Sequence, residues 1–363
     1  FMTVLGVAGC TALLLIGFGI QDSILPIVDK QSGQLTHNDL TISLSDEKAL
    51  TMEQGLADTL DSSSAVRSWG AFYTKSTTLY NEEGGSADVS IVGAEDDARM
   101  TEYFTFRTRV GHDPIPFEED SVILTEKTAL NLELSVGDTF YVEAADGSRV
   151  PLVLTGITEN YMFTRLYLSN AQLQALLGST PEWNTVYGLT GCTTEVEYNA
   201  LRTKLLGCNY VSSVSFTEDT TSMFGSLIGS LNYVVVLIIV CAAALAAVVL
   251  YNLISVNLAE RKKELATIKV LGFYDKEVYR YIFREIELLS LIGSGVGLLL
   301  GVPLHRFIVL TVEMDQLMFI RTIAPHSYLL AVALTMLFTF VVCFAMRRHV
   351  RHISMVESMK APE

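Results

Sequence analysis

The chain has 363 residues, of which 50% are hydrophobic and 18% are charged, and its formal net charge is −15 at pH 7. An ordinary soluble protein carries about 25% charged residues, so this composition is too apolar for that class. The high hydrophobicity also excludes a disordered chain, and the acidic balance argues against a nucleic-acid partner.

Four stretches without charged residues predict four membrane-spanning helices. A helix needs about 20 apolar residues to cross a bilayer. The uncharged stretches are residues 1–21, 220–259, 288–305 and 322–346. We therefore expect transmembrane helices at 1–21, 223–256, 286–310 and 326–346. Residues 311–325 then form a short outer loop and residues 347–363 a tail.

The first stretch is interpreted as a transmembrane helix and not as a cleaved signal peptide. It lacks a basic beginning and an Ala-x-Ala cleavage site. The chain begins at Phe1, directly at the membrane edge, and we interpret it as a fragment that lacks an N-terminal part.

Residues 22–222 are predicted to form a mixed α+β domain with stalk-like ends. Two strand-like runs, 139–144 and 149–157, flank the pair Asp146-Gly147, which is typical of a hairpin. Residues 122–124 predict a strand followed by a helix, and residues 186–191 and 211–216 predict two further strands.

Two helices of this domain have recognisable ends. One begins near Ser169 or Asn170 and stops at Gly178. The other stops at Gly207, and its expected apolar side consists of Val196, Leu201 and Leu205.

The sequence contains no catalytic motif, no Walker motif of its own and no His or Cys spacing typical of a metal site. We therefore expect no catalytic, cofactor-binding or metal-binding residues. The acidic runs 95–97 and 118–120 are interpreted as solvated loops in preference to Ca²⁺ ligands. Cys192 and Cys208 lie in the outer domain, and their spacing leaves a disulfide open.

The second uncharged stretch is long enough for more than one membrane crossing. Residues 220–259 would extend about 60 Å as a helix, about twice the hydrocarbon core. Gly225 and Gly229 are candidate breaks in that helix.

The distribution of charge predicts the orientation. Residues 22–219 hold 30 acidic and 12 basic residues, whereas residues 257–285 hold seven Lys or Arg. The tail adds Arg347, Arg348, Arg351 and Lys360. Because Lys and Arg accumulate on the cytoplasmic side, we expect a multi-pass protein of the plasma or inner membrane with both ends in the cytoplasm.

Residues 257–285 form the segment between the second and third spans. Leu258, Leu265 and Ile268 lie near one helical face, and Gly272 is placed to end the helix. Two interpretations remain open. An interfacial helix would hold lipid head groups, and a docking helix would bind a cytoplasmic partner through an apolar face with a charged rim.

The third span carries Gly293, Gly297 and Gly301 at intervals of four residues. Although the glycines resemble a dinucleotide fingerprint, this spacing places them on one face of a membrane helix, where small residues allow helices to approach closely. We therefore expect a helix-packing role, with Pro303 bending or ending the helix.

The segment "NLAERKKELATIKVLGF" at 257–273 resembles the signature of FtsX-like permeases, the membrane subunits of ABC transporters of the MacB and LolCE kind. Residues 1–24 resemble the first span of that family, and residues 120–142 with 151–157 resemble the MacB-like extracytoplasmic core domain. The tail at 347–360 is also similar, although Met355 stands where the family usually has Pro. The resemblance implies a four-span membrane protein with a large α+β domain between the first and second helices.

The resemblance further implies a non-catalytic subunit that works with a separate cytoplasmic ATPase and exports or extracts a lipid, peptide or lipoprotein. It implies ATPase contact by Leu258, Glu260, Arg261, Glu264, Leu265, Ile268, Leu271 and Gly272. Further expected partners are membrane lipids and a second permease unit or a second copy of the chain, and this chain would be the C-terminal unit of a larger permease.

Two other function classes remain open. The same machinery in the cell-division members of the family controls an outer enzyme or signalling partner instead of moving a substrate. An ATP-independent transporter or channel is less favoured, because the spans lack the charged residues that mark ion or proton paths. The sequence identifies neither the substrate nor the direction of transport.

Overall fold

The computed structural model describes residues 2–52, 55–144, 147–260, 264, 267–268, 274–314 and 317–351. The chain divides into two units, each treated separately below. The helical unit comprises Phe1–Leu25, Ile228–Val312 and Ile320–Glu363, and the α/β unit comprises Pro26–Leu227 and Glu313–Phe319. The chain therefore enters the α/β unit twice. The first entry supplies Pro26–Leu227, and the second supplies the seven-residue loop Glu313–Phe319.

Four long helices carry the apolar stretches. They are α1 (Met2–Ile24), α9 (Thr217–Glu260), α11 (Asp275–Val312) and α12 (Pro325–Arg351). By length and composition, four segments could cross a membrane: Thr3–Leu35, Val236–Val256, Phe283–Val312 and Pro325–Ala345. The α+β domain thus lies between the first and second apolar helices in the chain, as the sequence predicts.

Neither the glycines of α9 nor the proline of α11 interrupts its helix. α9 is a single helix of 44 residues that includes Gly225 and Gly229, which corresponds to about 66 Å at 1.5 Å per residue. α11 runs through Pro303 and continues to Val312, so the alternative that Pro303 ends this helix is wrong. In a protein, neighbouring helices and local adjustments can accommodate a proline inside an apolar helix.

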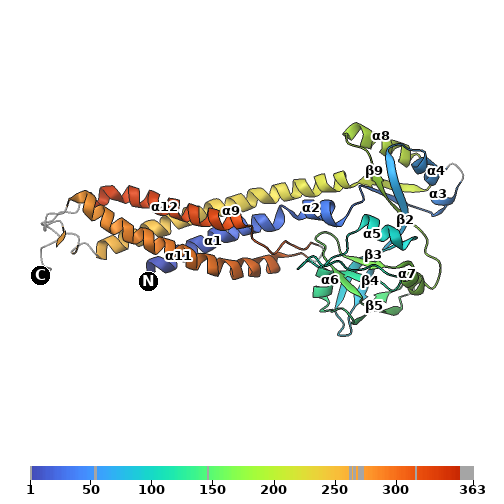
Figure 1. The fold of residues 1–363 in the computed structure, drawn as a ribbon, viewed down its shortest axis with the longest axis horizontal. Helices are drawn as coiled ribbons and strands as arrows, with labels where there is room; N and C mark the ends of the chain where they lie inside the picture. The colour runs from blue at the N-terminus through green and yellow to red at the C-terminus, as the bar shows by residue number, and fades with distance from the viewer. Residues whose placement is uncertain are drawn as a thin grey trace. The chain divides into compact units, whose positions relative to one another are not determined.

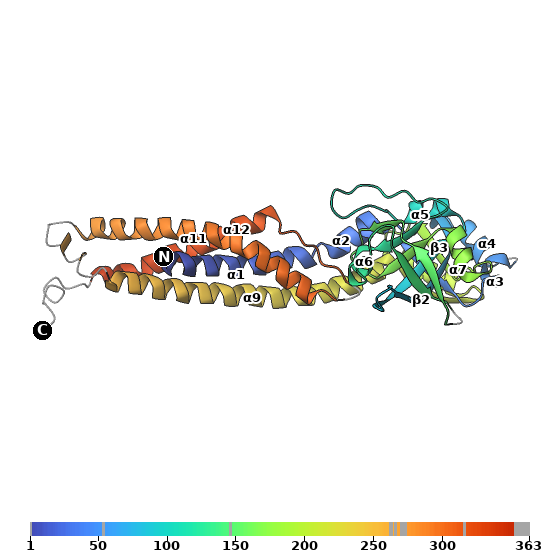
Figure 2. The same ribbon diagram turned by 90° about the horizontal axis from the view of Figure 1, so that it is seen from below.

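Within the helical unit, α1 packs along α11 and also against α12, and the two views of Figures 1 and 2 agree on this arrangement. One buried cluster joins all four helices through Val7, Leu250, Ile254, Phe283, Ile286, Val342 and Cys343. A second cluster contains Leu14, Leu15, Ala242 and Ala331. Many other apolar side chains of α9, α11 and α12 are exposed, as expected for surfaces that face lipid.

The α/β unit is built on a ten-stranded mixed sheet. Its strands are β1 (Leu40–Leu44), β2 (Val66–Tyr80), β3 (Ser86–Ala94), β4 (Val122–Thr125), β5 (Thr139–Glu143), β6 (Arg149–Val153), β7 (Gly156–Thr158), β8 (Arg165–Leu168), β9 (Thr185–Thr190) and β10 (Val211–Phe216). The order is β10-β1-β9-β2-β3-β8-β4-β7, and β5 pairs with both β2 and β6. The pairs β3–β8 and β4–β7 are parallel, whereas the other pairs are antiparallel.

Short helices connect these strands. They are α2 (Ile27–Lys30), the π-helix η1 (Gln31–Leu35), α3 (Lys48–Thr51), α4 (Leu56–Asp61), α5 (Asp97–Tyr103), α6 (Glu126–Asn131), α7 (Asn170–Leu177) and α8 (Glu195–Leu206). Figure 1 shows α3, α4 and α8 near the end of the sheet that carries β9, and α6 and α7 near β4 and β5.

Three apolar clusters hold the α/β unit together. Leu40, Ile42 and Leu44 alternate with less buried residues along β1, because successive strand side chains point to opposite faces, and they join a cluster with α4 and α8. A second cluster centres on Phe140 and Leu166. The third is aromatic and contains Phe72, Tyr103, Phe104, Phe106, Tyr167 and Tyr187.

The sequence predicts β4 to β7, β9, β10 and the helices α6 to α8, with two corrections, and makes no prediction for the other strands and short helices. The run 149–157 forms two strands, β6 and β7. The Leu154 amide still bonds to Asp138 across the hairpin, whereas the Thr155 amide bonds to Val122 in β4. Val196 is 78% exposed and does not share a face with the buried Leu201 and Leu205. Five residues at 100° each separate Val196 from Leu201 by about 140° around the helix.

The N-terminus of α8 offers a test of the fold in the α/β unit. Thr194 accepts a hydrogen bond from the Glu197 amide, and Glu197 reaches back to the Thr194 amide, which completes a capping box. We expect a fragment spanning residues 31–216 to melt cooperatively, and Thr194→Ala to lower its free energy of unfolding by about 1 kcal/mol. Urea denaturation followed by circular dichroism measures this difference. Thr194→Ser keeps the acceptor and serves as the control, so equal losses in both variants would contradict the capping role.

Candidate functional site

The segment expected to contact an ATPase is described in part. Glu260 is the last residue of α9 and is exposed, and Glu264 is also exposed. Leu258 lies within α9, although its side chain is not described. Arg261, Leu265, Leu271 and Gly272 lie outside the described residues.

Among the described expected contact residues, Ile268 differs from the exposed Glu260 and Glu264. Its side chain is half-buried and packs against the cluster that contains Leu250, Phe283 and Val342. Part of its apolar surface is therefore used within the helical unit. The role of the eight residues in docking stays a prediction, and Ile268 has to be tested apart from Leu265.

Three of the four glycines of α11, Gly293, Gly297 and Gly301, face α1 at close range. A Cβ atom at Gly297 would lie 2.6 Å from the Ala8 carbonyl oxygen, and one at Gly293 would lie 2.8 Å from Val7 Cβ. At Gly301 the nearest atom would be Leu15 Cδ2 at 2.9 Å. Since backbone atoms cannot give way as a flexible side chain can, Gly297 marks the tightest approach of the two helices.

Polar side chains add links between the spans. The hydroxyl groups of Thr11 and Thr335 lie 3.2 Å apart in the interior of the helical unit. Near the C-terminal end of α1, the Ser23 hydroxyl lies 3.1 Å from Nε2 of the buried His305. Hydrogen bonds of this kind help to fix one helix against another in an apolar environment.

Asp22 connects the end of α1 with the beginning of α12. Its carboxylate accepts hydrogen bonds from the Ala324 amide at 2.9 Å and from the Ser327 hydroxyl at 2.6 Å. Nε2 of His326 lies 3.5 Å from the same carboxylate. A carboxylate at the N-terminus of a helix satisfies amides that lack an intrahelical partner. The sequence gives no signal for this pairing, because Asp22 merely marks the end of an uncharged stretch.

A second site missed by sequence reasoning lies in the α/β unit, at the loop of residues 159–163, here called the junction segment. The side chain of Gln31 in η1 contacts this segment. Its Oε1 accepts hydrogen bonds from the amides of Tyr161 at 2.9 Å and Met162 at 3.2 Å, and its Nε2 donates to Asn160 at 2.8 Å. All four residues are buried, so these bonds replace water on the backbone.

The junction segment also contains a buried carboxylate. Glu159 has a fully buried side chain and accepts a hydrogen bond from Arg107 Nε at 2.6 Å and one from the Tyr161 hydroxyl at 2.6 Å. Burial and the neighbouring Glu159 raise the pKa of Tyr161, so its hydroxyl remains a donor at physiological pH. Arg107 also donates to Gln34 at 2.9 Å, which ties the network back to η1.

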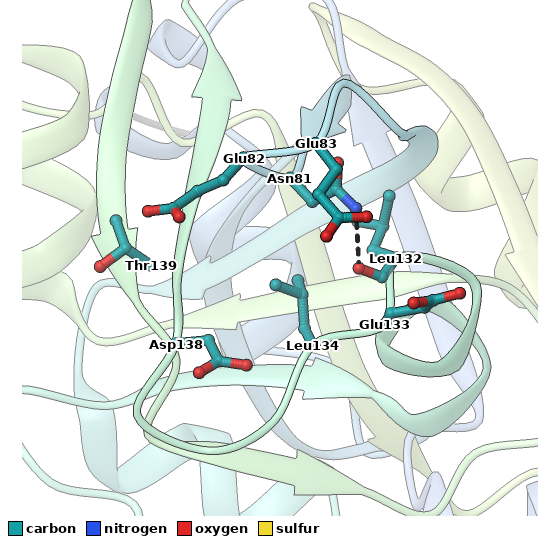
Figure 3. Close-up of a pocket in the computed structure, with 8 residues that line it drawn as sticks. All are labelled: Asn81, Glu82, Glu83, Leu132, Glu133, Leu134, Asp138 and Thr139. Carbon is teal, nitrogen blue, oxygen red and sulfur yellow. Dashed lines mark hydrogen bonds between the residues drawn. The ribbon is translucent and has the colours of Figure 1, made fainter.

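An acidic cleft opens on another face of the α/β unit. It has a volume of about 280 Å³, and Figure 3 shows the side chains that surround it, with the Asn81 amide donating to the Leu132 carbonyl. Its carboxylates belong to Glu82, Glu83, Glu133 and Asp138. Such a cleft attracts cations. Among the described residues, however, no three His, Cys, Asp or Glu side chains are arranged to hold a metal ion.

The other residues considered for ligands or bonds have local structural roles. Asp96 caps α5 by accepting a hydrogen bond from the Ala98 amide, and Asp97 accepts one from the Asn170 amide. Cys192 and Cys208 are not bonded to each other, and both contact the cluster beneath β1 and α8. These residues provide packing and caps within the fold.

The arrangement of apolar helices and mixed sheet defines a multi-pass membrane protein with an α+β domain inserted after its first span. Two family models match the chain. The MacB-like periplasmic core domain matches residues 2–200, and the FtsX-like permease C-terminal domain matches residues 236–355. The chain belongs to this FtsX-like permease family of ABC-transporter type, whose members are permease-type membrane subunits and normally work with a cytoplasmic ABC ATPase.

Solved structures of low identity also resemble the chain. The periplasmic region of MacB from Actinobacillus actinomycetemcomitans is 13% identical, with 52% of this chain and 93% of that chain covered and a TM-score of 0.33. The extracellular domain of the noncanonic ABC-type transporter YknZ from Gram-positive bacteria is 14% identical, with coverage of 50% and 99% and a TM-score of 0.32. A permease-protein domain from Porphyromonas gingivalis is 11% identical, with coverage of 50% and 90% and a TM-score of 0.30. The search of curated proteins gives no match.

The glycine contacts of α11 predict a difference between two neighbouring positions. Gly297→Ala forces α1 and α11 apart, and we expect it to lower stability by about 1–3 kcal/mol. At Gly295 a Cβ atom would meet nothing within 4 Å, so Gly295→Ala is the matched control on the same helix. The purified variants are heated to a series of temperatures, and size-exclusion chromatography measures how much monodisperse protein remains at each, which gives a melting temperature. Equal melting temperatures for the two variants would remove the packing role of Gly297.

Proposed function

We propose that this chain is the permease subunit of an ABC transporter and that a separate ATPase docks on residues 258–272. ATP hydrolysis in that partner then drives movements of the α/β unit. The observation that carries the proposal is the continuity of α9. This helix begins at Thr217 in the α/β unit and ends at Glu260, inside the proposed docking segment.

A continuous helix suits the transmission of force. Each residue of α9 is linked to the next turn by backbone hydrogen bonds, so a displacement at one end moves the other end without an intervening hinge. Gly225 and Gly229 lie inside the helix without interrupting it. The proposed mechanism therefore moves the α/β unit and does not require a central channel for the substrate.

Charge supports an orientation in which the α/β unit lies outside the cell membrane and both chain ends lie in the cytoplasm. The segment 22–219 carries 30 acidic and 12 basic residues, and the segment 257–285 carries seven Lys or Arg. Basic residues near the ends of spans remain on the cytoplasmic side. The proposed docking segment then faces the compartment that contains ATP.

The proposed cargo is a lipid, a peptide or a lipoprotein that the α/β unit helps to export or extract. The proposed energy source is a cytoplasmic ABC ATPase, with which members of this family normally work. The chain itself would act as a non-catalytic subunit that binds the ATPase on one side and the cargo on the other.

Leu265 provides the cleanest test of docking, because Ile268 also packs inside the helical unit. We expect Leu265→Asp to reduce co-purification of the ATPase by roughly 30-fold, which corresponds to about 2 kcal/mol for a buried interface residue. The amount of ATPase is normalised to inserted permease. Ile268→Asp is expected to lower both ATPase recovery and the stability of the permease.

Thr267→Asp is the matched control, because Thr267 is exposed and lies two residues from Leu265 on a different helical face. Normal recovery of the ATPase with Thr267→Asp and reduced recovery with Leu265→Asp would support docking. If Leu265→Asp recovers as much ATPase as the unsubstituted chain, the segment instead binds the lipid surface.

The orientation has its own test. Ser148 is exposed beside the hairpin of β5 and β6, whereas Lys263 belongs to the basic segment. We expect Ser148→Cys to react with a membrane-impermeant thiol reagent in intact cells, and Lys263→Cys to react only after the cells are opened. Labelling of the unsubstituted chain gives the background from its five cysteines. The reverse pattern would invert the orientation.

A further inference from the structure

The loop between α11 and α12 belongs to the α/β unit. Seven residues, Glu313–Phe319, form part of that unit, although both flanking helices belong to the helical unit. Met318 and Phe319 are buried in it, with exposed fractions of 1% and 6%. Asp315 and Gln316 lie outside the described residues. The sequence suggests only a short outer loop at this position.

A nearly buried ion pair holds the loop. Lys127 Nζ in α6 lies 3.0 Å from Glu313 Oε2, and the two side chains are 14% and 1% exposed. The other oxygen of the same carboxylate accepts a hydrogen bond from the Phe319 amide at 3.1 Å. Glu313 therefore fixes the loop to α6 and also closes the loop on itself. Removal of either partner breaks a buried ion pair, which is destabilising.

The loop also pairs with the junction segment. The Met318 amide donates to the Tyr161 carbonyl at 2.9 Å, and Leu317 forms an antiparallel bridge with Met162. The amides of Tyr161 and Met162 are already bonded to Gln31. The backbone of two residues is thus bonded on one side to the chain that follows the first span, and on the other side to the chain that joins the third and fourth spans.

This double attachment leaves the junction segment little freedom to move alone. Glu159 and Asn160 are buried and hydrogen-bonded as well, and a fully satisfied buried polar network is rigid. A displacement of either attached chain therefore has to move the junction segment or break its hydrogen bonds.

We propose that the described residues of this loop, Glu313, Met314 and Leu317–Phe319, form a mechanical clasp, secured by Lys127, through which displacements of α11 and α12 reach the junction segment of the α/β unit. The ATP-driven origin of these displacements rests on the proposed function, whereas the clasp itself does not. Force enters the α/β unit through this loop in addition to the segment that follows α1 and the helix α9.

The test is hydrogen exchange of the full chain in lipid nanodiscs, without ATP or a partner protein. Lys127→Met keeps the aliphatic stem and removes the charge, and Glu313→Gln keeps an acceptor for the Phe319 amide. Each single variant is expected to raise exchange about tenfold or more in peptides that cover 313–319 and 159–163. The double variant is expected to add little to either single variant, because both remove one interaction.

Two controls separate the clasp from a general loss of stability. Lys127→Arg keeps the charge and is expected to exchange like the unsubstituted chain. Lys48→Glu disrupts an exposed ion pair with Asp46 and is expected to leave both segments unchanged. Exchange in α8 should stay constant in all variants.

Faster exchange in 313–319 alone, with 159–163 unchanged, would overturn the proposal, because the loop would then be docked without controlling the junction segment. Additive effects of Lys127→Met and Glu313→Gln would also overturn it. Since no ATPase is present, a failure of the proposed function leaves these outcomes unaffected.

Discussion

Covalent continuity between the two units is confined to four peptide connections, and this constraint organises the rest of the structure. The chain passes between the units after Leu25, after Leu227, after Val312 and after Phe319. A movement that is to travel from membrane helices into a folded domain needs stiff connections at such points. The second connection lies inside the uninterrupted helix α9, and the first is followed at once by α2 and η1.

Side chains near the first, third and fourth connections form hydrogen bonds or ion pairs inside their own unit. Gln31 binds the junction segment after the first connection, and Glu313 binds Lys127 after the third. In the helical unit, Asp22 ties the end of α1 to the residues that begin α12. Buried polar contacts thus lie beside these connections as well as elsewhere in the described part of the chain. Away from them, the units are held by apolar clusters and by close backbone contact at Gly297. Polar networks give a defined geometry, whereas apolar contacts supply most of the stability.

The sequence predicts the four spans, the strands β4 to β7, β9 and β10 and the helices α6 to α8, because each depends on local signals. It does not predict the long strands β2 and β3. Uncharged stretches identify α1, α9, α11 and α12. Ser169 is one of two predicted starts of α7, and Gly178 and Gly207 mark the ends of α7 and α8, whereas the Thr194 cap of α8 is found only in the structure.

The alternative that Pro303 ends its helix and the prediction for Val196 are wrong because tertiary packing, and not the local sequence, determines the outcome at these positions. Pro303 is accommodated inside α11. Val196 is exposed although it is hydrophobic, because its position around α8 points it away from the buried face.

The junction segment could not be predicted in the same way. Gln31 and Tyr161 are distant in the sequence, and neither forms part of a recognisable motif. Lys127 and Glu313 are ordinary charged residues whose pairing depends on the fold alone. The glycine face of α11 was predictable, since a spacing of four residues is visible in the sequence, and the structure adds that its partner is α1.

The central claim is that ATP hydrolysis in a docked partner moves the α/β unit through these connections. The most direct measurement is hydrogen exchange in the complex of permease and ATPase, compared without nucleotide and with ATP trapped by vanadate. The account predicts a change of exchange at 159–163 on trapping, and the loss of that change when Leu265→Asp prevents docking. Unchanged exchange throughout residues 26–227 with the nucleotide trapped would contradict it.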